Sequence, residues 1–473
     1  MSLNAGELAA EAEAPPHAPK SRLRRELSSF AVLMLTLSSL SPVVSVFGVG
    51  GDVLHQAGSG AAVLFGAAIL AAVVWSVVYA ELGSAYPYAG GDYVAVGSVL
   101  GGWAGVVTLV LWAVTAGPSI AFSAEALVPY VAQLAPQLPT PLVTFGGLAG
   151  ALALALLSVR RGALVTGVFL AVETVAVVVL IVVGASHPVR TPVSVLLHPV
   201  LLGASGGLVP VTLSVLGLGA ISAVYATVGG NQAINFGEEL RDPHKRMGRV
   251  VLMACLIGAF ATALPIVFVV LSAPDLGALL RSPAPFAQFL TTAMGPWAGP
   301  ALSAGVALAI FNANIVSIMG QARLYFSLGR DGLFPKPVNR LLSGVDAHGT
   351  PRAATLIVTA FSAACCFLPG HTLLVFISGL LVYGWSLVCI AVLVGRRRGQ
   401  TGANGYWRSP LFPLAPVVGL CMAAVFTVAD LFDADAGRPS LLLLGLVVVA
   451  ALAWYHLGLR RRGWRPQLGE SEG

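Results

Sequence analysis

Long apolar runs dominate this chain, and they restrict its fold more than any other feature. Each run approaches the length of about 20 residues that a helix needs to cross the hydrocarbon core of a bilayer. A transmembrane barrel would instead show alternating segments of about 10 residues. Of the 473 residues, 57% are hydrophobic and only 10% are charged, which excludes an ordinary soluble domain. The sequence therefore predicts an all-α polytopic membrane protein.

The apolar runs predict about twelve transmembrane helices. Their expected ranges are 29–54, 61–81, 101–130, 141–158, 163–185, 210–237, 248–272, 298–322, 353–369, 371–394, 411–430 and 438–459. The expected organisation is, in order, a polar tail (1–28), a first group of five helices (29–185), a loop (186–209), a second group of five helices (210–394), two further helices (395–459) and a second tail (460–473).

The basic residues predict how the chain is oriented in the membrane. With twelve spans, 23 of the 26 Lys and Arg residues fall on one side, and only Arg190, Arg281 and Arg438 fall on the other. Basic residues concentrate on the cytoplasmic side of membrane proteins. Both termini are therefore expected in the cytoplasm of an integral cell-membrane protein, and the loop 186–209 is expected outside.

Two of the expected spans contain helix-breaking residues at membrane depth. The first carries Ser38, Ser39, Ser41 and Pro42, and the sixth carries the triplet at 229–231. Unwound backbone inside a membrane is tolerated where protein, water or a ligand satisfies its polar groups. Paired breaks in corresponding helices of two halves indicate a substrate site between inverted repeats. The alternative is that these small residues only permit close helix packing.

Four motifs carry a resemblance to a known family. They are AELGSAYPYAGGDYVAV (80–96), VGGNQAINFGEELRDP (228–243), ARLYFSLGRDGLFP (322–335) and HGTP (348–351). In this order they resemble motifs of the amino acid/polyamine/organocation (APC) transporter superfamily. The resemblance implies a LeuT-like fold of two inverted five-helix repeats with discontinuous helices 1 and 6, plus two C-terminal helices. It also implies secondary transport of amino acids or related amines.

The resemblance places the substrate at the two breaks. Ser38, Ser39 and Ser41 align with a Gly-Ser-Gly type triplet of helix 1, from which this sequence departs. Helix ends and short hydroxyls can still hold a carboxylate, while unwound carbonyls hold an ammonium group. The alternative for each serine is a hydrogen bond back to its own helix.

In helix 6, a Gly-Phe-Glu triplet of the superfamily corresponds to Gly229, Gly230 and Asn231. Glycine in place of the ring is expected to enlarge the pocket, and the neutral amide to disfavour a cationic side chain. Tyr225 falls where relatives carry an aromatic gate, although it can equally be an aromatic packed in the bundle. On helix 8, Asn314 is expected to contribute a polar group to the same site.

Glu173 lies near the middle of the fifth span, where a carboxylate costs about 2.5–3.5 kcal/mol on insertion scales. The resemblance aligns it with a titratable Lys of proton-coupled relatives, so the position is supported but the charge is reversed. Burial favours the protonated form of a carboxyl group, which suits proton symport. The alternative is a neutral carboxyl group held by a neighbouring hydroxyl group.

Charged residues at the inner face are expected to form a gate. The acids Glu81, Glu238 and Glu239 are expected to pair with basic residues that include Arg323, and a solvated rim is the competing interpretation.

The expected function is proton-coupled import of a neutral amino acid by alternating access, without a cofactor, metal or nucleic acid. Alternatives of the same fold are an amino acid or amine exchanger, a sodium-coupled permease and a polyamine or amine permease. The chain has no catalytic motif of a membrane enzyme, and the oligomeric state stays open.

Overall fold

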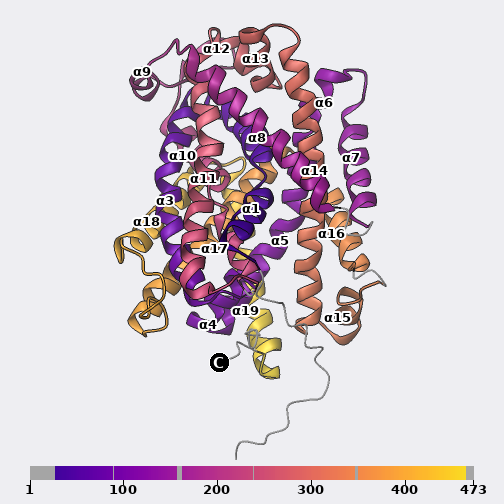
Figure 1. Ribbon diagram of the computed structural model, residues 1–473, viewed down its shortest axis with the longest axis vertical. Helices are drawn as coiled ribbons and strands as arrows, with labels where there is room; N and C mark the ends of the chain where they lie inside the picture. Colours follow the sequence, from indigo (N-terminus) through magenta and orange to yellow (C-terminus); the bar gives the residue numbers. More distant parts are fainter. Residues whose placement is uncertain (1–26, 89, 157–161, 238, 347–349, 465–473) are drawn as a thin grey trace, which may run out of the picture.

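The computed structural model describes residues 27–464 except 89, 157–161, 238 and 347–349. Helices make up most of this part of the chain, and they form an elongated bundle (Figure 1). Within the described residues, seven helices are long and apolar enough to cross a membrane, and three shorter apolar helices accompany them. The expectation of a polytopic helical membrane protein is therefore confirmed.

The described residues up to Ser186 form eight α-helices and one π-helix. They are α1 (Ser29–Leu40), η1 (Val44–Val49), α2 (Gly50–Ala57), α3 (Gly60–Ala85), α4 (Asp92–Leu100), α5 (Gly102–Ala126), α6 (Val128–Leu134), α7 (Thr140–Ala155) and α8 (Gly162–Ser186). The remaining elements are α9 (Pro192–Leu197), β1 (Val200–Leu202), β2 (Leu208–Pro210), α10 (Leu213–Thr227), η3 (Gly230–Phe236), α11 (Pro243–Ser272), α12 (Leu276–Arg281), α13 (Pro285–Met294), α14 (Ala298–Arg330), α15 (Lys336–Leu342), α16 (Arg352–Cys365), α17 (Gly370–Arg397), α18 (Leu414–Phe432), α19 (Gly437–Trp454), η4 (Tyr455–Leu459) and η5 (Arg460–Arg462).

The first expected span is interrupted, as its sequence predicts. Helix α1 ends at Leu40, and Ser41 adopts a left-handed conformation with φ 44° and ψ 78°. Because Ser41 precedes a proline, the helical conformation is disfavoured at this residue. The chain then continues through the π-helix η1 into α2. The break therefore lies between α1 and the segment formed by η1 and α2.

The sixth expected span is interrupted as well. Helix α10 ends at Thr227, Val228 is extended, and the 3-10 helix η3 begins at Gly230. The glycines at 229 and 230 explain the stop, because glycine has the lowest helix propensity after proline. The range 210–237 thus contains two helical segments joined by a short extended link.

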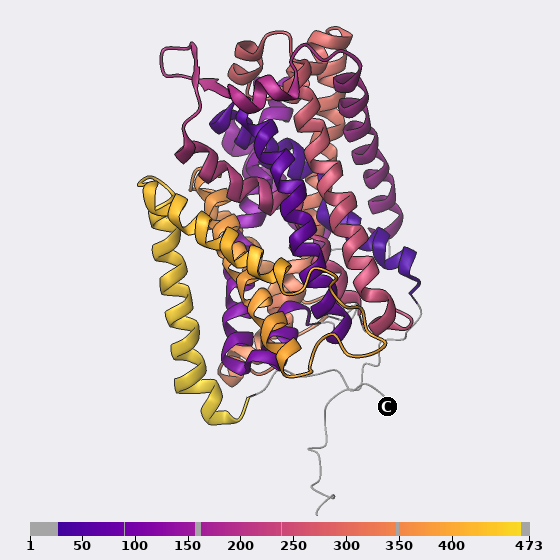
Figure 2. The ribbon, with the colours of Figure 1, turned by 90° about the vertical axis from the view of Figure 1, so that its left-hand side faces the viewer.

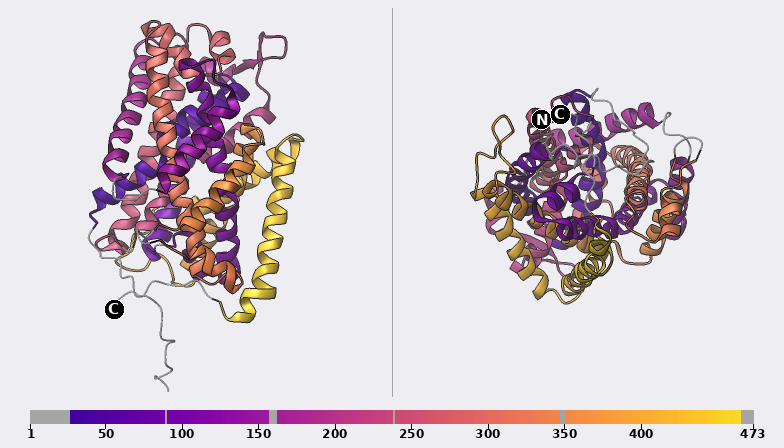
Figure 3. Two further views of the ribbon diagram at one scale, coloured as in Figure 1. Left: turned by 90° about the vertical axis from the view of Figure 1, so that its right-hand side faces the viewer. Right: turned by 90° about the horizontal axis from the view of Figure 1, so that it is seen from below.

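Helix packing brings the end of α1 against the link between α10 and η3. Helix α1 packs against both α11 and η3, while η1 packs against α5, α10 and α14. The last two helices lie along one side of the bundle, where α18 contacts α3, α10 and α17 (Figure 2; Figure 3). Helix α19 contacts α5, α17 and α18, so the C-terminal pair does not line the central region.

The two ends of the bundle differ. One end carries α9, α12, α13 and the antiparallel hairpin of β1 and β2, while α4 and α15 lie at the other end (Figure 1; Figure 2). The backbone N–H of Ser59 donates to the carbonyl of Val200 at 2.8 Å, and its hydroxyl accepts from the Val200 N–H at 2.9 Å. These bonds hold the hairpin against the start of α3.

Candidate functional site

The two helix breaks meet inside the bundle. A Cβ atom at Gly229 would overlap Cδ2 of Leu40, the last residue of α1. A Cβ at Gly258 of α11 would lie 3.1 Å from the other methyl group of Leu40. Glycine is therefore required where the end of α1 approaches the link between α10 and η3. The structure brings the predicted residues Ser41 and Gly229 to the two sides of this meeting point.

Gly230 faces α11 and not an open pocket. A Cβ at this position would lie 2.6 Å from Sγ and 2.9 Å from Cα of Cys255. The backbone amides of Gly229, Gly230 and Asn231 hydrogen-bond to the Cys255 thiol group. The expectation that Gly230 enlarges a substrate pocket is wrong, because α11 already fills the space of the missing side chain.

The hydroxyl group of Ser41 is buried and has no hydrogen-bond partner in the described chain. Its carbonyl group accepts the N–H groups of Val44 and Ser45 at 3.1 and 3.3 Å, so the turn is held by its backbone. Ser38 and Ser39 lie in the last turn of α1, and their side chains are outside the described parts of the structure. Among the described residues, the Ser41 hydroxyl group therefore makes no hydrogen bond back to its own helix.

Two further predicted residues carry buried polar atoms without partners among the residues that the structure describes. They are Asn314 on α14, which is fully buried with both amide atoms unpaired, and Glu173 on α8, whose Oε2 atom is unpaired. Helix α14 packs against α1, η1 and α8. A buried polar atom without a hydrogen bond costs about 1–3 kcal/mol. Helices α8 and α14 both contact α1, so these atoms lie on helices next to the first break.

Tyr225 links α10 to α5 just before the second break. Its hydroxyl group hydrogen-bonds with Ser119 of α5. The ring packs partly buried against the main apolar core. The predicted residue is thus held between two helices near the site, and its role as an aromatic gate stays a prediction.

Asn231 has a partner that the sequence did not predict. Its Nδ2 atom donates to Oδ2 of Asp92 at 3.2 Å, and the Tyr79 hydroxyl group donates to the same oxygen at 3.1 Å. Burial raises the pKa of Asp92 to about 6, although hydrogen bonds from Tyr79, Asn231 and Trp112 lower it. The only sequence signal was an acid within the motif at 80–96, and 139 residues separate it from Asn231.

The inner network differs from the expected one. The fully buried carboxylate of Glu81 accepts from Nε and Nη2 of Arg396 at 2.8 and 2.6 Å. It also accepts from the Thr401 hydroxyl group at 3.1 Å and the Ser409 N–H at 2.9 Å. Glu81 therefore links α3 by hydrogen bonds to the end of α17 and to the segment that follows α17.

The predicted partner Arg323 lies on an exposed position of α14. The backbone carbonyl group of Glu239 accepts the N–H of Leu27 at 2.9 Å. Among described residues, Glu81 pairs with Arg396 and not with Arg323, so the expected partner of Glu81 is wrong, while a gate role of Glu239 stays a prediction. Glu238 lies outside the described residues. The physical reason is that Arg396 of α17 lies against the C-terminal end of α3, a contact that sequence order does not reveal.

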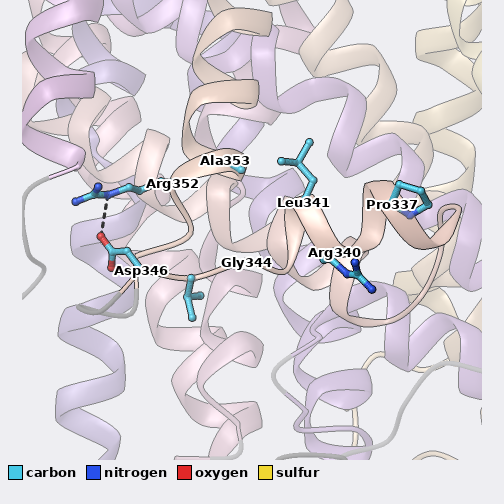
Figure 4. A pocket seen from close by; sticks show the side chains of 8 residues that line it. Pro337, Arg340, Leu341, Gly344, Asp346, Arg352 and Ala353 are labelled. Atoms are coloured by element: carbon cyan, nitrogen blue, oxygen red, sulfur yellow. Dashed lines mark ion pairs between the residues drawn. The ribbon is translucent and has the colours of Figure 1, made fainter.

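A separate groove of about 570 Å³ lies at the end of the bundle that carries α15 (Figure 4). Its lining includes the ion pair in which Nε of Arg352 lies 2.8 Å from Oδ2 of Asp346. All lining residues belong to 337–353. The groove is therefore a surface feature between α15 and α16, remote in sequence and element from both breaks.

Apolar helices of membrane-crossing length around two interrupted helices define an integral, multi-pass membrane protein with a buried polar site. Comparison with protein families agrees with this class. The family model for amino acid permeases matches residues 27–452, and the chain belongs to this family. Its members act as transporters and not as enzymes.

Individual relatives are similar over much of their length. The branched-chain amino acid permease BcaP of Lactococcus lactis is 26% identical over 408 residues, covering 79% of this chain and 83% of that protein. BcaP of Bacillus subtilis is 24% identical over 466 residues, covering 90% and 92%. The D-serine/D-alanine/glycine transporter of Escherichia coli K12 is 25% identical over 315 residues, covering 62% and 64%. These findings support an amino acid as the small-molecule substrate.

Proposed function

We propose that this protein imports a neutral amino acid across the cell membrane together with protons. The observation that carries the proposal is the contact between two interrupted helices, α1 and α10–η3, beside buried polar atoms without partners. Interrupted helices expose backbone dipoles that bind charged groups. An amino acid has one group of each charge, which suits such a pair of helix ends.

The proposed site holds the amino acid by its backbone groups. Carbonyl groups at the end of α1 carry partial negative charge and take the ammonium group. The Ser41 hydroxyl group, the backbone of the break and the Asn314 amide provide hydrogen bonds for the carboxylate and its surroundings. A neutral, apolar side chain is favoured because two relatives are named branched-chain permeases, and position 231 carries an amide where the superfamily motif has an acid.

Transport in this proposal proceeds by alternating access in a fold of two inverted five-helix repeats, with both termini in the cytoplasm. Glu173 binds the coupling proton, because its carboxyl group is buried on α8, which packs against α11 and α14, and its Oε2 atom has no partner in the described residues. The ion pair of Glu81 with Arg396 closes the inner side and separates when the protein opens inward. An exchanger or a sodium-coupled permease would use the same site with a different driving force.

Uptake by the purified protein in proteoliposomes tests this function. Labelled L-leucine, L-isoleucine, L-valine, glycine, D-serine and L-lysine are compared with an acidic exterior, with equal pH on both sides, and with a sodium gradient. The proposal predicts accumulation of neutral amino acids driven by the pH gradient. Accumulation that needs sodium, or that needs a second amino acid inside, would replace proton symport by one of the alternatives. The absence of uptake for every amino acid would contradict the proposal.

A further inference from the structure

The buried carboxylate of Asp92 has no place in the expected function, although it touches the interrupted sixth helix. Asp92 is 7% exposed and stands in the first turn of α4. Its hydrogen-bond donors are neutral side chains from three other elements, Tyr79 of α3, Trp112 of α5 and Asn231 of η3. Among the ion pairs of the described chain, none includes Asp92. A buried charge held only by neutral donors is costly unless each donor is fixed.

The side-chain amide of Asn231 on η3 can hydrogen-bond to the Asp92 carboxylate in only one orientation. An ionised carboxylate accepts hydrogen bonds and donates none. Asn231 must therefore present its Nδ2 atom to Asp92, as it does at 3.2 Å. Its Oδ1 atom is left as an acceptor, and the negative charge behind the amide strengthens that acceptor.

Close packing also fixes the position of η3, apart from the hydrogen bond to Asp92. Gly237 at the end of η3 lies so close to the preceding junction that a Cβ would be 2.7 Å from Cα of Pro87. On the other side, Ile234 lies against α3, where a Cβ at Gly83 would be 2.8 Å from its Cγ1 atom. These contacts are apolar or steric, so they fix where η3 lies but not which way the Asn231 amide points.

We propose that Asp92 is a positioning residue for the substrate site, which holds the Asn231 amide so that Oδ1 accepts a hydrogen bond from the amino group of the substrate. The negative charge that position 231 lacks is thereby supplied from α4 through a hydrogen bond. This inference rests on the proposed function for the identity of the substrate. The hydrogen bond between Asp92 and Asn231 of η3 does not depend on the proposed function.

Exchanging the acid and the amide between positions 92 and 231 tests the proposal. In Asp92→Asn the two amides can pair in either orientation, so η3 loses a charge-assisted bond. We expect hydrogen exchange of peptides covering 229–237 to become about tenfold faster, the change that corresponds to about 1.4 kcal/mol. Asn231→Asp places two carboxylates together and is expected to loosen η3 as well. The double variant Asp92→Asn with Asn231→Asp restores one acid and one amide, and we expect near wild-type exchange.

Asp331→Asn is the matched control. This acid is also buried, and its Oδ2 atom accepts from the hydroxyl group of Tyr93, the residue next to Asp92, at 3.1 Å. Its removal is expected to leave exchange at 229–237 unchanged. Unchanged exchange in Asp92→Asn, or a double variant no better than the two single variants, would overturn the proposal.

Uptake of L-isoleucine separates this inference from the proposed function. Asp92→Asn is expected to raise KM about tenfold with a smaller effect on the maximal rate, and the double variant is expected to recover KM. A wild-type protein that transports no amino acid would contradict the proposed function, while hydrogen exchange still decides the role of Asp92. Wild-type transport with an unchanged KM in Asp92→Asn would overturn the link from Asp92 to the substrate.

Discussion

Asn314 illustrates a conflict between stability and function at the scale of a single residue. Its amide is fully buried on α14, and neither of its polar atoms has a partner in the described chain. Replacement of such a group by an apolar one of similar size removes a desolvation cost. A residue kept at a cost to stability indicates a functional site. The same reasoning applies to the hydroxyl group of Ser41.

Asn314→Leu is therefore expected to increase the free energy of unfolding of the ligand-free protein by about 1 kcal/mol. The same variant is expected to lose the rise in melting temperature that a bound amino acid produces in the wild type. Asn312→Leu is the control, because two residues along a helix place a side chain on a different face. A destabilised Asn314→Leu variant that keeps the ligand response would contradict a binding role.

Glu173→Gln tests the coupling of protons at the scale of one carboxyl group. Glutamine keeps the shape and hydrogen-bonding capacity of the neutral acid but cannot release a proton. We expect uptake driven by a pH gradient to be lost, while exchange of amino acid across the membrane continues. Glu239→Gln serves as the control at an acid outside the expected spans. Unchanged pH-driven uptake in Glu173→Gln would remove this residue from the mechanism.

At the scale of elements, a glycine is required where the backbones of two elements approach each other closely. Gly230 is pressed against the Cys255 backbone of α11, whereas a Cβ at Gly51 in α2 would meet nothing within 4 Å. Gly230→Ala is expected to destabilise the protein by about 1–3 kcal/mol, because overpacking forces α11 away from η3. Gly51→Ala is expected to be neutral or to stabilise, because alanine is the better helix former. Equal melting temperatures for the two variants would contradict the described packing.

The ion pair of Glu81 with Arg396 joins α3 to α17 and is expected to stabilise the fold. Removal of one partner from a buried ion pair leaves an uncompensated charge and costs about 3–5 kcal/mol. Arg396→Gln is therefore expected to lower the melting temperature far more than Arg397→Gln, which changes an exposed neighbour on the same helix. In transport, we also expect Arg396→Gln to favour the inward-open form. Similar stability of the two variants would contradict a stabilising role of this ion pair.

At the scale of the whole molecule, local composition predicts the helices and the breaks. A proline after Ser41 and paired glycines at 229 and 230 act within one helical turn, so their effect is visible in the sequence. Contacts between distant segments are not visible in this way. Glu81 and Arg396 are 315 residues apart, and Asp92, the partner of Asn231, is 139 residues away from it in a motif that did not predict this contact. The filled space at Gly230 likewise depends on where α11 lies.

The central claim is that an amino acid binds where the two interrupted helices meet. Photo-crosslinking with a diazirine analogue of leucine, followed by peptide mapping, tests this most directly. The account predicts that labelling is suppressed by unlabelled leucine and falls on peptides around Ser41, Tyr225 to Asn231, and Asn314. Competed labelling confined to the groove at 337–353, or no competed labelling anywhere, would contradict it.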